Sequence, residues 1–388
     1  MRSVSEHLEH LLTLVSPTEV EAVALAEAVG RVLRGDVVAV ADAPPWDNSA
    51  MDGYAVASAD GSAGSWRVSQ DIPAGHAPLP LEPGTVARIM TGAPMPQGAD
   101  AVVPVERTDA GTDRVRIRDW PVAGAHVRPA GADMREGGVV LAAPRRLRAV
   151  DVAAAAAAGC AEVAVARRPR VAVLVTGDEL VAPGEPLGPA AIYDSNSALL
   201  RAGVQEWGGA VTSVEVVRDG PQALLQALAG LDADLVLTAG GVSAGAYDVV
   251  KEALVPRGVQ FAPVAMQPGK PQGWGRIDGV PIVCAPGNPV SVAVTFRLFV
   301  VPMLCAMLGV PAPTTRPLRV AQGWRTPDGR AQLMPVSIEG DTVRPATSGG
   351  SGSNLAGALA KADGFAYVAA DVVQVELGAT VDVMGLVP

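Results

Sequence analysis

The feature that most constrains this chain is the run LVLTAGGVSAGAYD at residues 235–248. An apolar strand pattern, 234–238, breaks into glycines, and a helical pattern follows at 247–254. Such a turn binds anions well, because glycines let backbone N–H groups approach a phosphate and the helix dipole favours negative charge there. The alternative is a plain strand–helix turn capped by Ser243 and Asp248, since the pattern is neither a dinucleotide fingerprint nor a P-loop.

Strand and helix patterns alternate between residues 170 and 308, which predicts a parallel, doubly wound sheet. The predicted strands are 171–175, 211–217, 234–238, 259–265 and 281–284. The predicted helices are 195–207, 221–231, 247–254 and 289–308. The last helix is very apolar, but Arg297 and Pro302 interrupt the run, so a core helix is favoured over a membrane span.

The rest of the chain predicts three further parts, so the expected fold class is multidomain, combining α+β and α/β. Helical patterns cover 4–15, 24–33 and 147–158, and short Val/Ile runs between Gly and Pro indicate an all-β module at 55–142. The expected domains are an N-terminal helix packing on the doubly wound domain (1–17), a helical linker domain (18–45 with 143–168), an inserted β domain (46–142), the doubly wound domain (169–312) and a C-terminal β domain (313–388).

Charge and cysteine usage exclude several classes of protein. The formal net charge of −10 argues against general nucleic-acid binding, so any anion must be bound by local positive charge. The three cysteines are scattered and odd in number, which fits a reducing compartment rather than a disulfide framework. The N-terminus has the pattern of an amphipathic helix and not of a signal peptide. We therefore expect a cytoplasmic protein that does not bind membranes.

Polar loops follow the predicted strands, and one precedes the first long helix of the sheet. Ligands of open α/β sheets bind outside the carboxyl ends of the strands. So many polar loops at one edge predict a binding site for a phosphorylated ligand. The expected binding residues are Thr176, Gly177, Asp194, Ser195, Asn196, Asp219, Gly240, Gly241, Ser243, Gly245, Pro271, Pro286, Gly287, Asn288, Pro289 and Ser291.

Three charged residues in these loops suit chemistry on an anion. Lys270 lies between two prolines and offers a point charge for an oxyanion; its alternative is a solvated surface lysine. Glu179 and Asp248 suit Mg²⁺, which keeps several waters and needs few carboxylates. The alternatives for these two are an exposed carboxylate and a helix N-terminal charge.

Two polar clusters lie outside the sheet. Asp47 belongs to the loop DNSAMDGY, and Arg128 and Asp133 belong to RPAGAD, while Thr91 opens a short TGAP segment. Turn chemistry and a surface ion pair are the structural alternatives for these residues. The four histidines show no spacing typical of metal ligands.

Taken together, these motifs resemble the MoeA family, the molybdopterin molybdenumtransferases or molybdate insertases, which include the E domain of gephyrin. The match runs in order over essentially the whole chain. The residues that carry it are DNSAMDGYAV (47–56), RIMTGAP (88–94), RPAGAD (128–133), VTGDEL (175–180), IYDSN (192–196), GGVSAGAYD (240–248), PGKP (268–271) and PGNPVS (286–291).

The resemblance implies a function in molybdenum-cofactor biosynthesis. The doubly wound domain would be the MogA-like molybdopterin-binding domain, and the reaction would be Mg²⁺-dependent insertion of molybdate into adenylylated molybdopterin with release of AMP. The family forms homodimers, and molybdopterin adenylyltransferase and molybdoenzymes are expected partners. The resemblance also places Arg330 and Ser353 near molybdate. It implies catalytic roles for Glu179, Asp248 and Lys270 and, across the dimer, for Asp47, Thr91, Arg128 and Asp133.

The sequence departs from the family pattern at two basic positions. Many members carry a second lysine where this chain has Gln267, and a later basic residue corresponds to Pro335. A catalytically weakened or tungstate-preferring paralog that binds molybdopterin is therefore an alternative. A molybdopterin adenylyltransferase is another, although the DNSAMDGY module and the C-terminal β domain argue against it.

Overall fold

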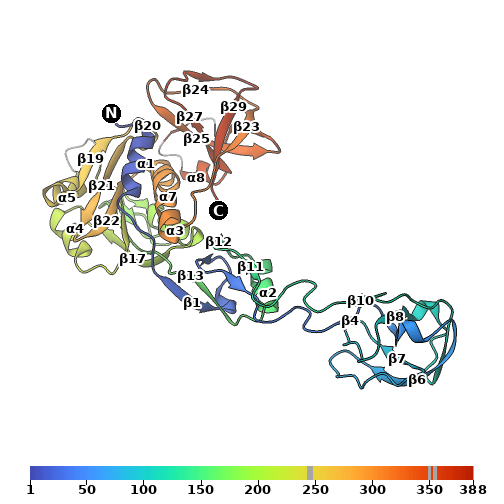
Figure 1. Ribbon diagram of the computed structural model, residues 1–388. Helices are drawn as coiled ribbons and strands as arrows, with labels where there is room; N and C mark the ends of the chain where they lie inside the picture. Colours follow the sequence, from blue (N-terminus) through green and yellow to red (C-terminus); the bar gives the residue numbers. More distant parts are fainter. Residues whose placement is uncertain (243–247, 348–350, 353–355, 388) are drawn as a thin grey trace. The chain divides into compact units, whose positions relative to one another are not determined.

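The computed structural model describes residues 1–242, 248–347, 351–352 and 356–387. The chain forms two compact units (Figure 1). The first contains Met1–Glu21, Gly30–Val32 and Ala166–Pro388, and the second contains Ala22–Val29 and Leu33–Val165. The chain passes between the units four times: within strands β1 (Val20–Ala24), β2 (Val32–Leu33) and β13 (Glu162–Ala166), and once between Val29 and Gly30.

A six-stranded sheet organises the first unit. Its strand order is β17 (Ala210–Val217), β14 (Arg170–Thr176), β18 (Leu235–Ala239), β22 (Val280–Ala285), β21 (Pro271–Ile277) and β19 (Gln260–Pro263). The first four strands are parallel, as the sequence predicts. The predicted parallel pairing of 259–265 is wrong, because β19 pairs antiparallel with β21, a strand that was not predicted. Since β21 is also antiparallel to β22, two reversals leave the carboxyl end of β19 at the same edge as the others.

Helices cover both faces of this sheet, which confirms the doubly wound fold. Along β14 the side chains alternate: Val171 and Val173 pack on one face, while Ala172 and Leu174 pack on the other. The first face is covered by α1 (Val4–Leu12), α3 (Asn196–Glu206) and the long helix at 289–308. The second face is covered by α4 (Pro221–Leu228) and α5 (Val249–Leu254). The short 3-10 helix η4 (Val255–Arg257) follows α5. The pairing of β15 (Leu180–Val181) with β16 (Ile192–Tyr193) links the loops after β14.

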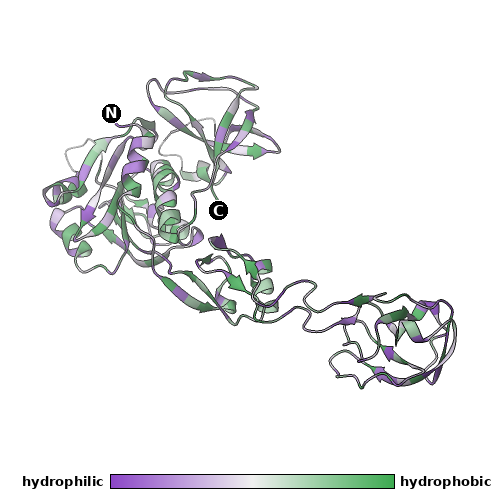
Figure 2. Ribbon diagram, in the orientation of Figure 1, coloured by the Kyte–Doolittle hydropathy of each residue, from purple (hydrophilic) through white to green (hydrophobic). Residues whose placement is uncertain are grey.

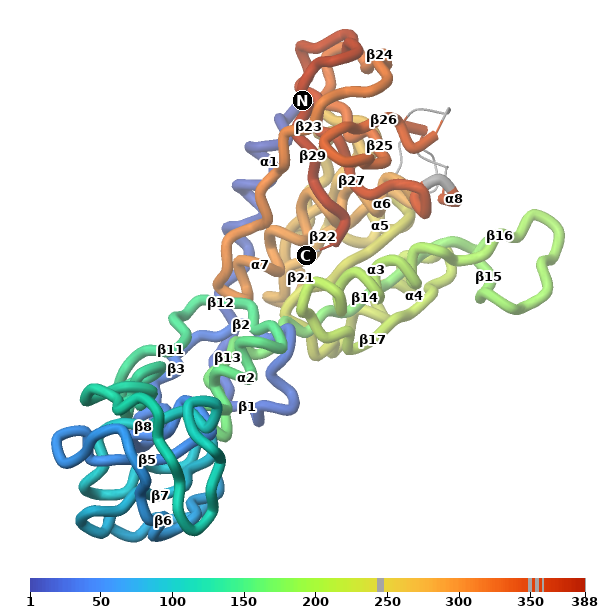
Figure 3. The backbone as a smooth tube through the Cα atoms, turned by 90° about the vertical axis from the view of Figure 1, so that its right-hand side faces the viewer, coloured from blue at the N-terminus to red at the C-terminus, as the bar shows by residue number. Residues whose placement is uncertain are grey.

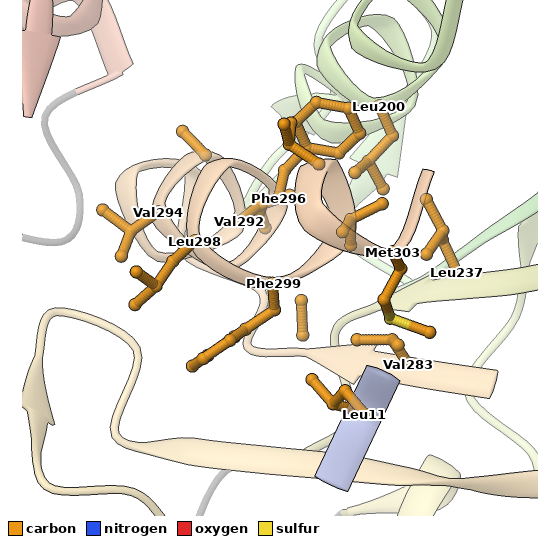
Figure 4. Packing of buried hydrophobic residues seen from close by; sticks show 14 of the residues in the cluster. Leu11, Leu200, Leu237, Val283, Val292, Val294, Phe296, Leu298, Phe299 and Met303 are labelled. Atoms are coloured by element: carbon orange, nitrogen blue, oxygen red, sulfur yellow. The ribbon is translucent and has the colours of Figure 1, made fainter. Parts of the chain in front are cut away.

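The most apolar helix belongs to the core of the first unit. It consists of α6 (Pro289–Thr295), a π-helical turn η5 (Phe296–Val300) and α7 (Val301–Leu308), and its hydrophobic colouring is clear in Figure 2. Its length and composition would allow it to cross a membrane, but 94% of it is buried inside the protein, as expected for a core helix. The ring of Phe299 packs edge-on against His7 of α1, and the side chain of Met303 points toward Val283 (Figure 4). Helix α1 lies beside α7 (Figure 3).

The C-terminal part of the first unit is a closed β-barrel. Strands β25, β26, β23, β29 and β27 follow one another, and pairing of β27 with β25 closes the circle. Strand β20 joins the barrel by pairing with β25, so it connects the barrel to the loop that precedes β21. The bounds are β20 (Met266–Gln267), β23 (Arg316–Val320), β24 (Trp324–Arg325), β25 (Ala331–Glu339), β26 (Thr342–Pro345), α8 (Ala356–Leu359), β27 (Gly364–Val368), β28 (Gln374–Val375) and β29 (Thr380–Gly385).

The second unit contains the predicted β module. Its five-stranded sheet has the order β8 (Ala101–Pro104), β5 (Gly53–Val56), β7 (Thr85–Ile89), β6 (Gly64–Ile72) and β9 (Arg114–Ile117). The smaller elements are β3 (Val37–Val38), β4 (Asn48–Ser49), η2 (Ser58–Asp60), η3 (Val105–Arg107), β10 (Val127–Arg128), β11 (Val139–Leu141), β12 (Arg145–Arg146) and α2 (Ala149–Ala157).

The helix predicted at 24–33 is wrong. Strand β1 leads into the short 3-10 helix η1 (Leu25–Glu27), and Leu33 pairs with Val165 in an antiparallel ladder. Gly30 has φ +77°, a left-handed conformation that a continuous α-helix excludes. The spacing of apolar residues in this segment fits a helix, but burial of Leu33 in the β-sheet decides its structure.

A partly buried ion-pair cluster lies at the edge of the sheet opposite the carboxyl ends of the strands. Asp234 accepts hydrogen bonds from Arg167 (Nη1 to Oδ2, 2.8 Å) and from the backbone N–H of Arg170 (2.7 Å). Burial acts to raise the pKa of Asp234, but the hydrogen bonds from Arg167 and Arg170 outweigh it and lower the pKa to about 2. The carboxylate therefore joins β14 to the start of β18.

We expect Asp234→Asn to lower the free energy of unfolding at pH 7 by about 1–2 kcal/mol, after allowance for solvent screening at this partly exposed group. Because the pKa of Asp234 in the folded state lies below its ordinary value of 3.8, this stability is present above about pH 4. It is lost as the pH falls toward 2. Urea unfolding of both proteins at pH 7 and pH 3 measures the effect. Asp232→Asn is the matched control, since Asp232 pairs with Arg170 while 77% exposed. A pH-independent difference, or an equal loss in the control, would contradict the assignment.

Candidate functional site

A cavity of about 810 Å³ opens at the carboxyl edge of the sheet, in the first unit. Its walls come from the loops after β14, β17, β18 and β22, from the start of α3 and α6, and from the barrel. The predicted residues that line it are Thr176, Gly177, Glu179, Ser195, Asn196, Asp219, Gly240, Gly241, Asp248, Lys270, Pro271, Pro286, Gly287, Asn288, Pro289 and Ser291.

Close backbone packing brings the loops after β18 and β22 together at the floor of the cavity. The N–H of Gly240 donates to the carbonyl of Ala285 (3.1 Å). A Cβ built on Gly287 would lie 3.3 Å from the Cα of Gly240, so the two chains meet where side chains are absent. Asn288 then occupies the N-cap position of α6, and Pro289 the first helical turn. The N-terminus of this long helix therefore faces the cavity and favours negative charge there.

Among the residues that the structure describes, two buried polar atoms of the cavity wall have no hydrogen-bond partner. The side-chain amide of Asn196 donates to the carbonyl of Gly287 (2.8 Å), which leaves its Oδ1 without a donor. The Oγ1 of Thr176 is likewise buried and unpartnered. An unsatisfied buried polar group costs about 1–3 kcal/mol, so both atoms are suited to polar groups of a bound ligand.

Three carboxylates and two cations line the cavity. Asp219 is tied to the loop after β14, because its Oδ2 accepts from the N–H of Asp178 (3.3 Å). Asp248 is the N-cap residue of α5, and Glu179 is exposed within the cavity wall. Lys270 and Arg330 supply the positive charge. Among the described residues, no group of three or more His, Cys, Asp or Glu side chains forms a metal cluster.

The loop that carries Lys270 is held from both sides. The carbonyl of Lys270 accepts from the N–H of Val264 (2.7 Å). The buried amide of Gln272 donates to the carbonyl of Gly269 (2.7 Å) and to Thr295 Oγ1 (2.9 Å), which attaches the loop to α6. These bonds fix the backbone on which the Lys270 ammonium is carried.

Of the predicted binding residues that the structure describes, Asp194 is the one that does not line the cavity. Its Oδ1 accepts from the N–H groups of Asn196 and Ser197 (3.0 Å each) and so stabilises the start of α3. Ser243 and Gly245 lie outside the described residues, as does Ser353.

Several lining residues were absent from the sequence-based set of binding residues. Ser351 and Gly352 come from the barrel, and Gln267 comes from β20. The Gly/Ser-rich sequence at 348–353 was the available signal for the first two, because such a sequence predicts a loop. The others are Leu180, Ile192, Tyr193, Val242, Met266, Pro268 and Gly269.

The second unit brings its own predicted residues together. Asp47 Oδ1 accepts from the N–H of Ala130 in the RPAGAD loop (2.8 Å), and β4 pairs with β10 so that Asn48 faces Arg128. Asp52 Oδ1 accepts from both the N–H and the hydroxyl of Thr91 (2.7 Å each), and these bonds lower the pKa of Asp52. Asp47, Thr91, Arg128 and Asp133 are all exposed. The three motifs therefore form one polar surface in this unit.

We expect Gly240→Ala to lower the free energy of unfolding by about 3 kcal/mol. Gly240 has φ +101°, and an added Cβ would lie 2.5 Å from the carbonyl oxygen of Thr176. Gly230→Ala is the matched control, because Gly230 has φ +72° with nothing within 4 Å of the added atom, and it should lose only about 1 kcal/mol. Urea unfolding measures both, and equal losses would contradict the close packing of this turn.

Comparison with family models covers nearly the whole chain. Residues 2–159 match the MoeA N-terminal region (domain I and II), residues 172–306 match the probable molybdopterin binding domain, and residues 317–386 match the MoeA C-terminal region (domain IV).

Curated relatives and a solved structure agree with these matches. Molybdopterin molybdenumtransferase 2 of Mycobacterium tuberculosis is 43% identical over an alignment 406 positions long that covers 100% of both chains. Molybdopterin molybdenumtransferase of Nostoc sp. is 40% identical over 342 residues, or 84% of this chain and 76% of the relative. The crystal structure of the molybdopterin biosynthesis MoeA protein from Pyrococcus horikosii has a TM-score of 0.86 and 31% identity, and covers 99% of this chain and 98% of that one. This chain belongs to the MoeA family of molybdopterin molybdenumtransferases.

Proposed function

We propose that this protein inserts molybdenum from molybdate into adenylylated molybdopterin and releases AMP. Membership of the family supports the coarser statement that the chain is a transferase of molybdenum-cofactor biosynthesis. The observation that carries the finer proposal is the cavity at the carboxyl edge of the sheet. It combines a helix N-terminus, two cations and two unpartnered buried polar atoms in a space of about 810 Å³.

The proposed binding mode follows from the donors and acceptors of the wall. The N-terminus of α6 and the N–H groups at Gly240 and Gly241 would bind the phosphoanhydride oxygens. Thr176 Oγ1 and Asn196 Oδ1 would meet polar groups of the pterin or the nucleotide. Lys270 and Arg330 would hold the molybdate dianion beside them, since ammonium and guanidinium groups only donate hydrogen bonds.

The residues present also fit a Mg²⁺ ion. Mg²⁺ is bound through one or two carboxylates together with water and phosphate oxygens, and the cavity wall offers Glu179 and Asp248. When bound, the ion would neutralise charge that develops on the phosphoanhydride as it breaks. The two carboxylates would fix its position, and Lys270 would keep molybdate oriented toward the sulfur atoms of the pterin.

We further propose that the protein is a homodimer and that Asp47, Thr91, Arg128 and Asp133 serve the cavity of a second copy. Their gathering on one exposed polar surface of the second unit supports this assignment. The bond from Thr91 to Asp52 would hold the threonine hydroxyl in one orientation.

Molybdenum content of the pterin tests the proposed function. The full chain is incubated with adenylylated molybdopterin, molybdate and Mg²⁺, the pterin fraction is separated, and its molybdenum is counted by mass spectrometry. We expect about one molybdenum atom per pterin without added ATP. Tight pterin binding with no molybdenum transferred would favour the binding-only alternative. A requirement for ATP would favour an adenylyltransferase.

A further inference from the structure

A buried side-chain relay leads from the barrel to the cavity wall. Gln332, on β25, is 3% exposed. Its Oε1 accepts from the indole Nε1–H of Trp324 (2.8 Å), and its Nε2 donates to the Oγ of Ser351 (3.1 Å). Ser351 is 7% exposed and lines the cavity. All three residues belong to the first unit, and none was singled out by the motifs of the family.

The relay fixes the direction of each hydrogen bond. An indole N–H only donates, so the atom of Gln332 that faces Trp324 must be the amide oxygen. The amide nitrogen then faces Ser351, which forces the Ser351 oxygen to act as the acceptor. The Ser351 proton must point elsewhere, and within the part of the chain that the structure describes it meets no protein acceptor. It is therefore available to a ligand in the cavity.

Strand pairing connects the segments that carry this hydroxyl and the two cations of the cavity. Gln267 of β20 lies opposite Gln332 of β25, and Lys270 follows β20 by three residues. Arg330 immediately precedes β25. Lys270, Arg330 and Ser351 all line the same cavity and surround one strand pair. We call the part of the cavity wall formed by Lys270, Arg330 and Ser351 the corner. Each of these residues offers a hydrogen-bond donor there, and the ammonium and guanidinium groups have no acceptor to offer.

We propose that Ser351, locked as a donor by Gln332, selects a fully deprotonated tetrahedral dianion at this corner. This inference rests on the proposed function and specifies how its inorganic substrate is recognised. Molybdate at neutral pH carries only acceptor oxygens, so it satisfies every donor. Inorganic phosphate near pH 7 is a mixture of HPO4²⁻ and H2PO4⁻, so each molecule keeps at least one P–O–H group, which neither the ammonium of Lys270 nor the guanidinium of Arg330 can accept. The neutral serine donor also compensates in part for the missing lysine at Gln267.

Calorimetric titration of the full-length protein with sodium molybdate, and separately with sodium phosphate, tests the selection. For Ser351→Ala we expect molybdate affinity to fall about tenfold, the effect of one hydrogen bond to a charged group, while phosphate affinity changes little. Gln332→Glu keeps the acceptor for Trp324 but replaces the donor to Ser351 by an acceptor. The serine proton then turns away from the ligand, so molybdate affinity should fall at least as far as in Ser351→Ala, and the preference for molybdate over phosphate should shrink.

Two further variants separate hydrogen-bond direction from packing. Gln332→Met fills the same space and leaves the serine free to rotate, so it should weaken molybdate binding only about two- to threefold. Ser337→Ala changes a serine on the same strand that lies outside the cavity wall, and it should bind molybdate as the wild type does. Thermal unfolding confirms that each variant is folded.

The outcomes distinguish this inference from the proposed function. Unchanged molybdate affinity in Ser351→Ala, or equal effects of Gln332→Glu and Gln332→Met, would overturn the role of Ser351 and leave molybdenum insertion standing. Ser351-dependent molybdate binding in a protein that transfers no molybdenum to the pterin would support the role of Ser351 and sink the proposed function. A wild type that binds no molybdate at millimolar concentration would overturn both.

Discussion

Asp248→Asn is expected to slow AMP release about a thousandfold, the largest effect of any single change considered for this protein. Asp248 is the N-cap residue of α5 and lines the cavity together with Glu179. The asparagine keeps the shape of the side chain but removes the negative charge that a divalent cation requires. The measurement is the steady-state rate of AMP release as a function of Mg²⁺ concentration.

The dependence of the rate on Mg²⁺ concentration distinguishes a metal-ligand role of Asp248 from a purely structural role at the start of α5. If Asp248 holds Mg²⁺, the concentration that gives half-maximal rate should rise at least tenfold in Glu179→Gln, whose remaining carboxylate still binds weakly. Asp278→Asn is the matched control, because Asp278 lies in an exposed turn with φ +48° that asparagine tolerates. Unchanged Mg²⁺ dependence in both site variants would contradict the metal role and restore the simple helix-cap interpretation.

Lys270→Met is expected to lower the rate of molybdenum insertion at least a hundredfold at low molybdate concentration. Lys270 is one of three lysines in the chain, and its loop is held by bonds from Val264 and Gln272. Methionine matches the length of the side chain but removes the charge that binds a dianion. The rate is measured at several molybdate concentrations, and most of the loss should appear as weaker apparent affinity for molybdate.

Two companion variants test whether the loss is caused by removal of the positive charge at this position. Lys270→Arg keeps the charge but changes its shape from a point to a planar fork, so it should recover part of the affinity. Lys361→Met removes an exposed lysine that does not line the cavity, and its rate should match the wild type. A Lys270→Met protein with normal molybdate dependence would show that oxyanion binding does not rest on this ammonium.

The parallel core of the sheet was predictable because its physical signal is local. Four short apolar strands, each followed by a polar loop, place residues such as Thr176, Gly240 and Asn288 at one edge in any doubly wound arrangement. The cavity wall contains these residues. The helix at 289–308 was predictable for the same reason, since Asn288 and Pro289 mark its start and apolar residues fill it.

The errors occur where long-range pairing decides the structure. Strand β21 has the sequence PQGWGRI, whose glycines and polar residues give no strand signal, yet it pairs with β22 on one side and β19 on the other. Residues 24–33 have helical spacing, but Gly30 and the pairing of Leu33 with Val165 give a different structure. In both segments tertiary contacts outweigh local propensity.

The side-chain relay of Trp324, Gln332 and Ser351 could not be predicted from the sequence, for a related reason. Gln332 occupies a strand in which a polar residue would normally face solvent, and its partners Trp324 and Ser351 are 8 and 19 residues away in sequence. Only closure of the barrel and pairing of β20 with β25 bring these groups to the cavity. Asp194 is the opposite case, a residue that the sequence predicts but that does not line the cavity. Its motif matches the family, but its carboxylate accepts a hydrogen bond at the start of α3.

Molybdate-dependent AMP release by the wild-type chain is the most direct test of the central claim. Adenylylated molybdopterin and Mg²⁺ are mixed with the protein, and AMP is quantified with and without molybdate. The account predicts that molybdate accelerates AMP release by orders of magnitude and that molybdenum appears in the pterin in equal amount. Equal rates of AMP release with and without molybdate would contradict the account. So would the absence of AMP release from a protein that binds the pterin tightly.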